Sequence, residues 1–199
     1  FIHAEEAYIS TAASPFSDAM AEKAMELIGE NIRRFVANRT DVEAAEAMMV
    51  GSLFAGIAFS FARLGNVHAM SHPVSAFFDV PHGVANAVLL PVVAEYNALA
   101  DHGRYYKIYN YISEIPAHED EFEPMMLVDA IRSLCKAIGI PANLTEAINQ
   151  AGKTGSISRK TIEEKIEAMA ADAMKSGNIA VNPRSSRQCD IEMLYRKAL

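Results

Sequence analysis

The sequence predicts an all-α protein that folds as a single domain over residues 1–199. Hydrophobic residues make up 51% of the chain, with ten Met and no Trp, a composition that favours helix over strand. Apolar residues recur at helical spacing along most of the chain, and no stretch alternates convincingly as a strand would. The length suffices for one sizeable core, and we find no internal repeat or domain boundary.

The N-terminal part predicts three helices. Residues 1–9 read as helix interior with no capping residue before them, which indicates that upstream sequence is missing. Ser14 ahead of Pro15 starts an amphipathic helix over 14–39, and Asp41 caps the helix that follows it.

The helix that Asp41 caps contains an uncharged run, Ala47–Ala62. At sixteen residues, interrupted by Gly51, Gly56 and two serines, the run is short for a membrane span. We therefore expect a central helix that is buried on all sides and no membrane association.

Three of the six histidines lie in the stretch from Gly65 to Asn97. His68 and His72 are four residues apart, so one helix places them on one face about a turn apart. His82 follows Pro81 in the expected first turn of the next helix, for which Asp79 or Val80 is the expected cap. The positive end of that helix disfavours protonation of His82 and leaves a lone pair for a metal ion.

The C-terminal half is predicted to be helical as well. We expect helices over 101–113, 125–137, 143–151, 158–175 and 187–197, with a loop over 176–186.

Charge and cysteine content exclude several classes of protein. A net charge of −7 without a basic stripe argues against a nucleic-acid surface. Cys135 and Cys189 are far apart and outside any C-x-x-C pair, so they are expected to be reduced thiols in a cytoplasmic protein. No basic segment precedes an apolar stretch at the start, so we expect no signal peptide.

The histidine spacing alone leaves metal binding open. His68 and His72 are equally explained as a buried polar pair, and His82 as a solvent-facing residue at a helix start. A divalent ion usually takes a carboxylate as well, but Asp79 is better explained as a cap and Glu6 as a helix-surface charge. The H-E-x-x-H motif is absent.

The stretch GIAFSFARLGNVHAMSHPVSAFFDVPHGVANAVLLPVVAEYN resembles the signature of the iron-containing (group III) alcohol dehydrogenases. The opening FIHAEEAYIS resembles the family's D-A-x-x-H-A-x-E-A-Y helix, and 178–184 resembles its loop ending in N-P-R. The resemblance covers the whole chain. It implies an all-α, multi-helix domain, namely the C-terminal domain of the dehydroquinate synthase-like / iron-dependent alcohol dehydrogenase type. The N-terminal Rossmann-like half of that type is absent from this sequence.

The resemblance also implies site residues. The metal ligands fall on His3, His68 and His82, with Fe²⁺ as the ion and Zn²⁺ as the alternative, and the family's Asp ligand falls upstream of residue 1. His72, which spacing would nominate as a ligand, is implied to be a catalytic residue beside the nicotinamide and the substrate. Phe59 is implied to line the cleft beside the cofactor. NAD or NADP would be bound mainly by the missing half.

The implied function is hydride transfer between a nicotinamide and a small alcohol or aldehyde. We expect this truncated domain to be inactive by itself, because it lacks the phosphate-binding half and one metal ligand, and we expect a homo-oligomer. Ser75 stands where many members have Gly, and Asn178 where many have Cys, which bears on substrate fit. Two alternatives stay open. One is a non-catalytic helical module with structural histidines, and the other is a relative such as a glycerol dehydrogenase or a metal-dependent cyclase that makes dehydroquinate.

Overall fold

A computed structural model describes residues 1–152 and 156–199 of the chain. These residues form helices and connecting loops and no strand, which confirms the predicted all-α class. The α-helices are α1 (Ile2–Ile9), α2 (Pro15–Ala37), α3 (Val42–Ala62), α4 (Asn66–Phe78), α5 (His82–Asn97), α6 (Arg104–Ile112), α7 (Pro124–Ala137), α8 (Leu144–Ala151), α9 (Arg159–Glu163), α10 (Ile166–Ala173) and α11 (Gln188–Ala198). Short 3₁₀ turns lie at Ala98–Ala100, Glu119–Glu121 and Ile179–Val181.

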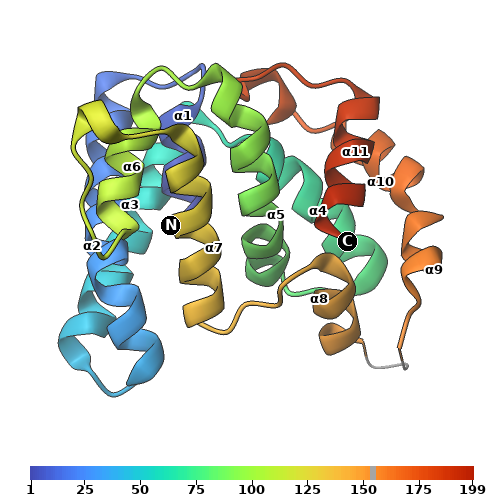
Figure 1. Ribbon diagram of the computed structural model, residues 1–199, viewed down its shortest axis with the longest axis horizontal. Helices are drawn as coiled ribbons and strands as arrows, with labels where there is room; N and C mark the ends of the chain where they lie inside the picture. Colours follow the sequence, from blue (N-terminus) through green and yellow to red (C-terminus); the bar gives the residue numbers. More distant parts are fainter. Residues whose placement is uncertain (153–155) are drawn as a thin grey trace.

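Helix α5 runs through the middle of the molecule, with α2 and α3 on one side and α4, α10 and α11 on the other (Figure 1). Helix α1 lies among α2, α3, α5 and α6, so that six of its eight residues are buried. Because α1, α4 and α5 are all interior helices, the segments that carry His3, His68 and His82 are held by the same core.

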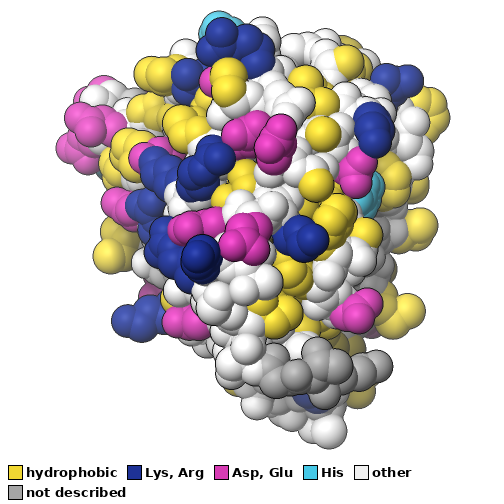
Figure 2. Space-filling model, turned by 90° about the vertical axis from the view of Figure 1, so that its right-hand side faces the viewer, with side chains coloured by type: hydrophobic (Ala, Val, Ile, Leu, Met, Phe, Trp, Pro, Cys, Tyr) yellow, Lys and Arg dark blue, Asp and Glu magenta, His cyan; other side chains and the backbone are white. Residues whose placement is uncertain are grey.

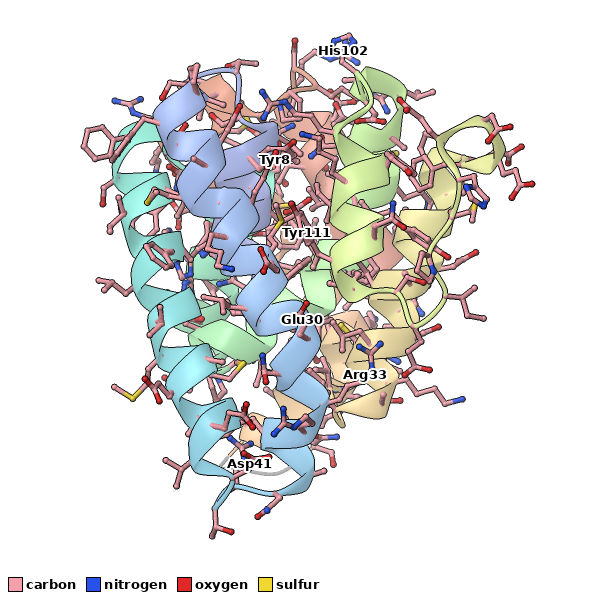
Figure 3. All side chains as sticks on the ribbon, turned by 90° about the vertical axis from the view of Figure 1, so that its left-hand side faces the viewer. Tyr8, Glu30, Arg33, Asp41, His102 and Tyr111 are labelled. Carbon is pink, nitrogen blue, oxygen red and sulfur yellow. The ribbon has the colours of Figure 1, made fainter. Side chains whose placement is uncertain are left out.

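Helices α2 and α3 form an antiparallel pair, with Asp41 at the turn that joins them (Figure 3). As predicted, Ser14 and Asp41 cap them: the Ser14 hydroxyl accepts from the Ser17 N–H, and the Asp41 carboxylate accepts from the Ala44 N–H. The two expected helix starts are therefore confirmed.

The expectation that the uncharged run of α3 is buried on all sides is wrong. The buried residues of the run are all small: Gly51, Ala55, Ala58 and Ala62. Several of its large residues face outward, with Met49 74% exposed, Leu53 62% and Phe61 64%, whereas Phe54 and Phe59 are partly buried against the core. Close contact with α2 selects the small residues, because a Cβ at Gly51 would lie 2.7 Å from Cγ1 of Ile28.

Two segments in the described part of the chain, α3 and His82–Ala100, are long and apolar enough to cross a membrane by length and composition alone. The most apolar window of His82–Ala100 is 61% buried inside the protein, as expected of a core helix, whereas that of α3 is 22% buried.

Two further expectations about helix boundaries need correction. The expected helix over 158–175 is divided into α9 and α10, because the N–H of Lys165 bonds the carbonyl of Ile162 only three residues back. Asp79 does not cap α5. It ends α4 in the left-handed region, with φ 55°, and α5 begins after Pro81 without a side-chain cap.

The face formed by the C-terminal helices carries positive and negative side chains interspersed with apolar ones (Figure 2). Several of these charges are paired within a helix, as in Arg159–Glu163 and Arg196–Glu192. This face shows no continuous basic stripe of the kind that binds a phosphate backbone.

The C-terminal loop is tied to α4 and α5 by Asn182, which is 5% exposed. Its Oδ1 accepts from the Asn66 N–H at 3.1 Å and from Nδ2 of Asn97 at 3.2 Å. Its Nδ2 donates to Oδ1 of Asn97 and to the carbonyl of Arg184. One side chain thus joins the loop, the start of α4 and the end of α5.

We expect Gly29→Ala to destabilise the protein by about 1–3 kcal/mol or more, because the new Cβ would lie 2.0 Å from the backbone oxygen of Tyr111. Gly56→Ala is the matched control on α3, where a Cβ meets nothing within 4 Å, and should stabilise by about 0.4–1 kcal/mol. Urea unfolding of both variants measures the difference. Equal midpoints for the two would contradict the close contact of α2 with α6.

We expect Asn182→Ala to cost on the order of 3 kcal/mol, because it leaves the Asn66 N–H and the Asn97 amide without this buried partner. Asn178→Ala, in the same loop, is the control: its side chain makes no hydrogen bond among the described residues. Thermal unfolding should separate the two variants by several degrees, and a wild-type midpoint for Asn182→Ala would refute the predicted role.

Candidate metal and substrate site

Helix α4 carries His68 and His72 and begins directly after Gly65. A Cβ at Gly65 would lie 2.9 Å from Oδ1 of Asn182 and 3.0 Å from Oε1 of Glu6, so the close approach of these two side chains requires a glycine. His68 lies in the first turn of the helix and is 1% exposed, whereas His72, a turn later, is exposed.

The first backbone N–H groups of α4 are satisfied by side chains from elsewhere in the chain. The Glu6 carboxylate accepts from the N–H of Val67 at 2.6 Å and from that of His68 at 3.4 Å. Asn182 accepts from the preceding N–H, that of Asn66. A carboxylate at a helix N-terminus is favourable because both the unpaired N–H groups and the helix dipole attract negative charge.

The same carboxylate fixes the His68 ring. Nδ1 of His68 lies 2.5 Å from Oε2 of Glu6, and both side chains are 1% exposed. On the other side of the ring, Nδ2 of Asn86 lies 3.1 Å from Nε2 of His68. An amide nitrogen can only donate, so Nε2 is the acceptor and the ring proton is on Nδ1.

Asn86 also joins His68 to His82. Its Nδ2 lies 3.1 Å from Nε2 of His82, the first residue of α5 and one turn before Asn86. One amide group therefore donates to both imidazoles, and their two lone pairs are directed at a common point. Nδ1 of His82 lies 3.5 Å from the hydroxyl of Ser71.

The remaining imidazoles lie beside these two. The ring of His3 lies 4.4 Å from that of His68 between centroids, and it also stacks on Phe59 of α3 at 4.8 Å. The ring of His72 stacks on that of His82 at 5.2 Å, and the His68 and His82 centroids are 5.3 Å apart. All four histidines therefore form one cluster drawn from α1, α4 and α5.

Burial and mutual proximity lower the pKa values of His3, His72 and His82. Desolvation, with smaller contributions from His68, the N-terminus and His82, lowers the pKa of His3 to about 4. The pKa values of His72 and His82 are also lowered, first by desolvation and then by the neighbouring imidazoles. Each of these rings thus keeps a lone pair at neutral pH.

Among residues 1–152 and 156–199, no group of three or more His, Cys, Asp or Glu side chains has its donor atoms arranged around a single ion. The residues that the sequence pointed to are nevertheless together: His3, His68, His72, His82 and Phe59 share this cluster. A shallow hollow of about 370 Å³ adjoins the exposed side of His72, between α4 and residues Asp172 and Lys175.

Sequence reasoning missed two residues of the site. Glu6 is not a helix-surface charge: it is 2% exposed and holds both α4 and His68. A charged residue in a helix that otherwise reads as interior requires a partner, which is the signal that could have identified it. Asn86 is 3% exposed, and its position four residues after His82 places it on the same helix face.

Other candidates lie differently. Asp79 is exposed at the end of α4 and therefore serves neither as a cap for α5 nor as a buried partner of the imidazoles. Ser75 is partly buried, and its hydroxyl has no hydrogen-bond partner among the described residues. Asn178 lies at the start of the 3₁₀ turn in the C-terminal loop.

Comparison with known proteins gives the family. The chain is 39% identical over 200 residues to the 1,3-propanediol dehydrogenase of Citrobacter freundii and 33% identical over 198 residues to the NAD-dependent methanol dehydrogenase of Bacillus methanolicus. These matches cover 98% and 99% of this chain but 48% and 49% of the two relatives, so the chain spans about half their length.

The fold agrees with this similarity. The alcohol dehydrogenase from Oenococcus oeni is similar over 100% of this chain and 49% of that structure, with a TM-score of 0.86 and 31% identity. The family model that matches residues 1–199 is that of the Fe-containing alcohol dehydrogenase family, C-terminal. The chain therefore belongs to the Fe-containing alcohol dehydrogenase family, in which it corresponds to the C-terminal domain.

Proposed function

We propose that this chain is the metal-binding, substrate-facing domain of an NAD(P)-dependent alcohol dehydrogenase or aldehyde reductase. The observation that carries the proposal is the Asn86 amide, which lies 3.1 Å from Nε2 of both His68 and His82. One buried and one exposed imidazole whose lone pairs meet at one point supply two of the nitrogen ligands that a divalent ion takes.

We infer that His3, His68 and His82 hold the ion, with Fe²⁺ as the family's metal and Zn²⁺ as the alternative. The donor chemistry fits, because all three rings are close together and the Nδ1 proton of His68 leaves a lone pair on its Nε2, which faces the Asn86 amide in this structure. Zn²⁺ competes well for nitrogen ligands. Such an ion supplies a Lewis acid that polarises the oxygen of a bound alcohol or aldehyde.

His72 is our candidate for the proton transfer. It is exposed toward the hollow beside α4, and its lowered pKa keeps the ring neutral and able to accept a proton near pH 7. Its stacking on His82 keeps it next to the proposed ligands without making it one of them.

Phe59 is our candidate for contact with the nicotinamide ring. It stacks on His3 from α3 and presents a half-buried apolar surface beside the imidazoles. We propose that NAD or NADP is bound mainly by the part of the relatives that this chain does not span, so that the chain by itself does not turn over substrate.

The setting that we propose is a cytoplasmic homo-oligomer that acts on a small alcohol or aldehyde, without nucleic acid or membrane. Both cysteines are free. The exposed apolar residues of α3 support the proposal that this helix contacts another protein surface, because large apolar patches on a protein commonly mark interfaces.

Metal content tests the ligand assignment. We expect the purified chain to bind Fe²⁺ or Zn²⁺ weakly and at partial occupancy, because the family's Asp ligand falls upstream of residue 1. We expect His82→Ala to lower the affinity at least tenfold further, because it removes an exposed ligand at little cost in packing. His102→Ala, an exposed histidine at the opposite end of α5, should bind as the wild type does (Figure 3). Inductively coupled plasma mass spectrometry and calorimetry measure both quantities. Unchanged binding by His82→Ala would refute the assignment.

A chimaera tests the reaction. This chain replaces the matching half of the Citrobacter freundii 1,3-propanediol dehydrogenase, and oxidation of 1,3-propanediol is followed by nicotinamide absorbance. We expect activity, and a loss of about 10²-fold in kcat for His72→Ala with the metal retained, because a general acid–base group is removed. A folded, metal-loaded chimaera without activity, or His72→Ala with wild-type kcat, would contradict the proposed roles.

A further inference from the structure

We propose that Glu6 is a positioning residue that holds the proton of His68 on Nδ1 and thereby keeps Nε2 of His68 available to a metal ion. The inference rests on the proposed function, since it takes His68 as a ligand. The residue does not itself face the common point of the imidazoles. It acts on the ion only through His68 and through the start of α4.

Three donors converge on the two carboxylate oxygens of Glu6. The N–H of Val67 lies 2.6 Å from Oε1, while the N–H and Nδ1 of His68 lie 3.4 Å and 2.5 Å from Oε2. The side chain is almost wholly buried, and its one ion-pair partner within the described residues is His68. A buried carboxylate must accept hydrogen bonds, so this environment requires a donor at Nδ1.

Contacts on the opposite side of the ring agree with that tautomer. Nε2 of His68 faces the amide nitrogen of Asn86, which donates and cannot accept. The ring is therefore bonded at both nitrogens, and each bond favours the proton on Nδ1. In metal sites, a carboxylate on the distal nitrogen of a ligating histidine both fixes the tautomer and raises the basicity of the ligating nitrogen.

Glutamine at position 6 would break this arrangement with little change in size. Its side chain offers one oxygen where three N–H donors need acceptors. If that oxygen stays on the N–H of Val67, the amide NH₂ faces Nδ1 of His68 and favours the proton on Nε2 instead. The lone pair that the proposed ion needs is then lost.

Glu5 provides a matched control on the same helix. It is 1% exposed, like Glu6, but its Oε2 has no hydrogen-bond partner among the described residues. Burial, reinforced by Glu6, raises the pKa of Glu5 well above its ordinary value. The contacts to the His68 ring and to the start of α4 are made by Glu6 and not by Glu5, so Glu5→Gln changes a buried carboxyl on α1 without touching the His68 ring.

The experiment uses the 199-residue chain, with ¹⁵N-labelled histidine, first free of metal and then titrated with Zn²⁺ in a calorimeter. We expect the wild-type His68 proton on Nδ1. For Glu6→Gln we expect a shift of the proton toward Nε2 and Zn²⁺ binding that is weaker by about 10–100-fold. Glu5→Gln should match the wild type in both measurements.

Two results would overturn the inference alone: a wild-type His68 protonated on Nε2, or wild-type Zn²⁺ affinity in Glu6→Gln while His68→Ala abolishes binding. The wild-type spectrum does not depend on whether Glu6→Gln folds. If His68→Ala leaves Zn²⁺ binding unchanged, the proposed ligand role of His68 is wrong and the inference about Glu6 fails with it.

Discussion

The interaction on which the site depends is the contact between the Glu6 carboxylate and the first turn of α4. This one group satisfies two backbone N–H groups at a buried helix start and also bonds the ring of His68. Without it, the start of α4 would leave unpaired donors in the core, at a cost of about 1–3 kcal/mol each. The energetic need to satisfy a helix terminus and the chemical need to orient an imidazole are therefore met by the same side chain.

Glu6 also links the position of His3 to that of His68. It lies one turn after His3 on α1, so the position of α1 fixes both His3 and the carboxylate that bonds His68. Asn86 does the same from α5, one turn after His82. Two buried polar side chains, Glu6 and Asn86, thus fix the positions of the imidazole rings, and each lies on the same helix as one of the histidines. A small shift of either helix would therefore move several of the rings.

The surroundings lower the pKa values of three of the four imidazoles. Burial removes water from His3, His72 and His82, and the neighbouring imidazoles disfavour a proton on them further. A neutral imidazole binds a cation without first releasing a proton. The open side of the cluster lies at His72 and His82, which are its exposed members, and the hollow beside α4 adjoins His72.

The sequence by itself determined the all-α class, the caps at Ser14 and Asp41, the start of α5 at His82 and, through resemblance, the family. These follow from local propensity and from an ordered motif. Only the tertiary structure decided which face of α3 is buried, because an uncharged helix has no polar side to mark its exposed face and only the fit against α2 selects the small residues. It also decided that Glu6 faces inward onto His68, since contacts 62 residues apart in sequence leave no periodic signal.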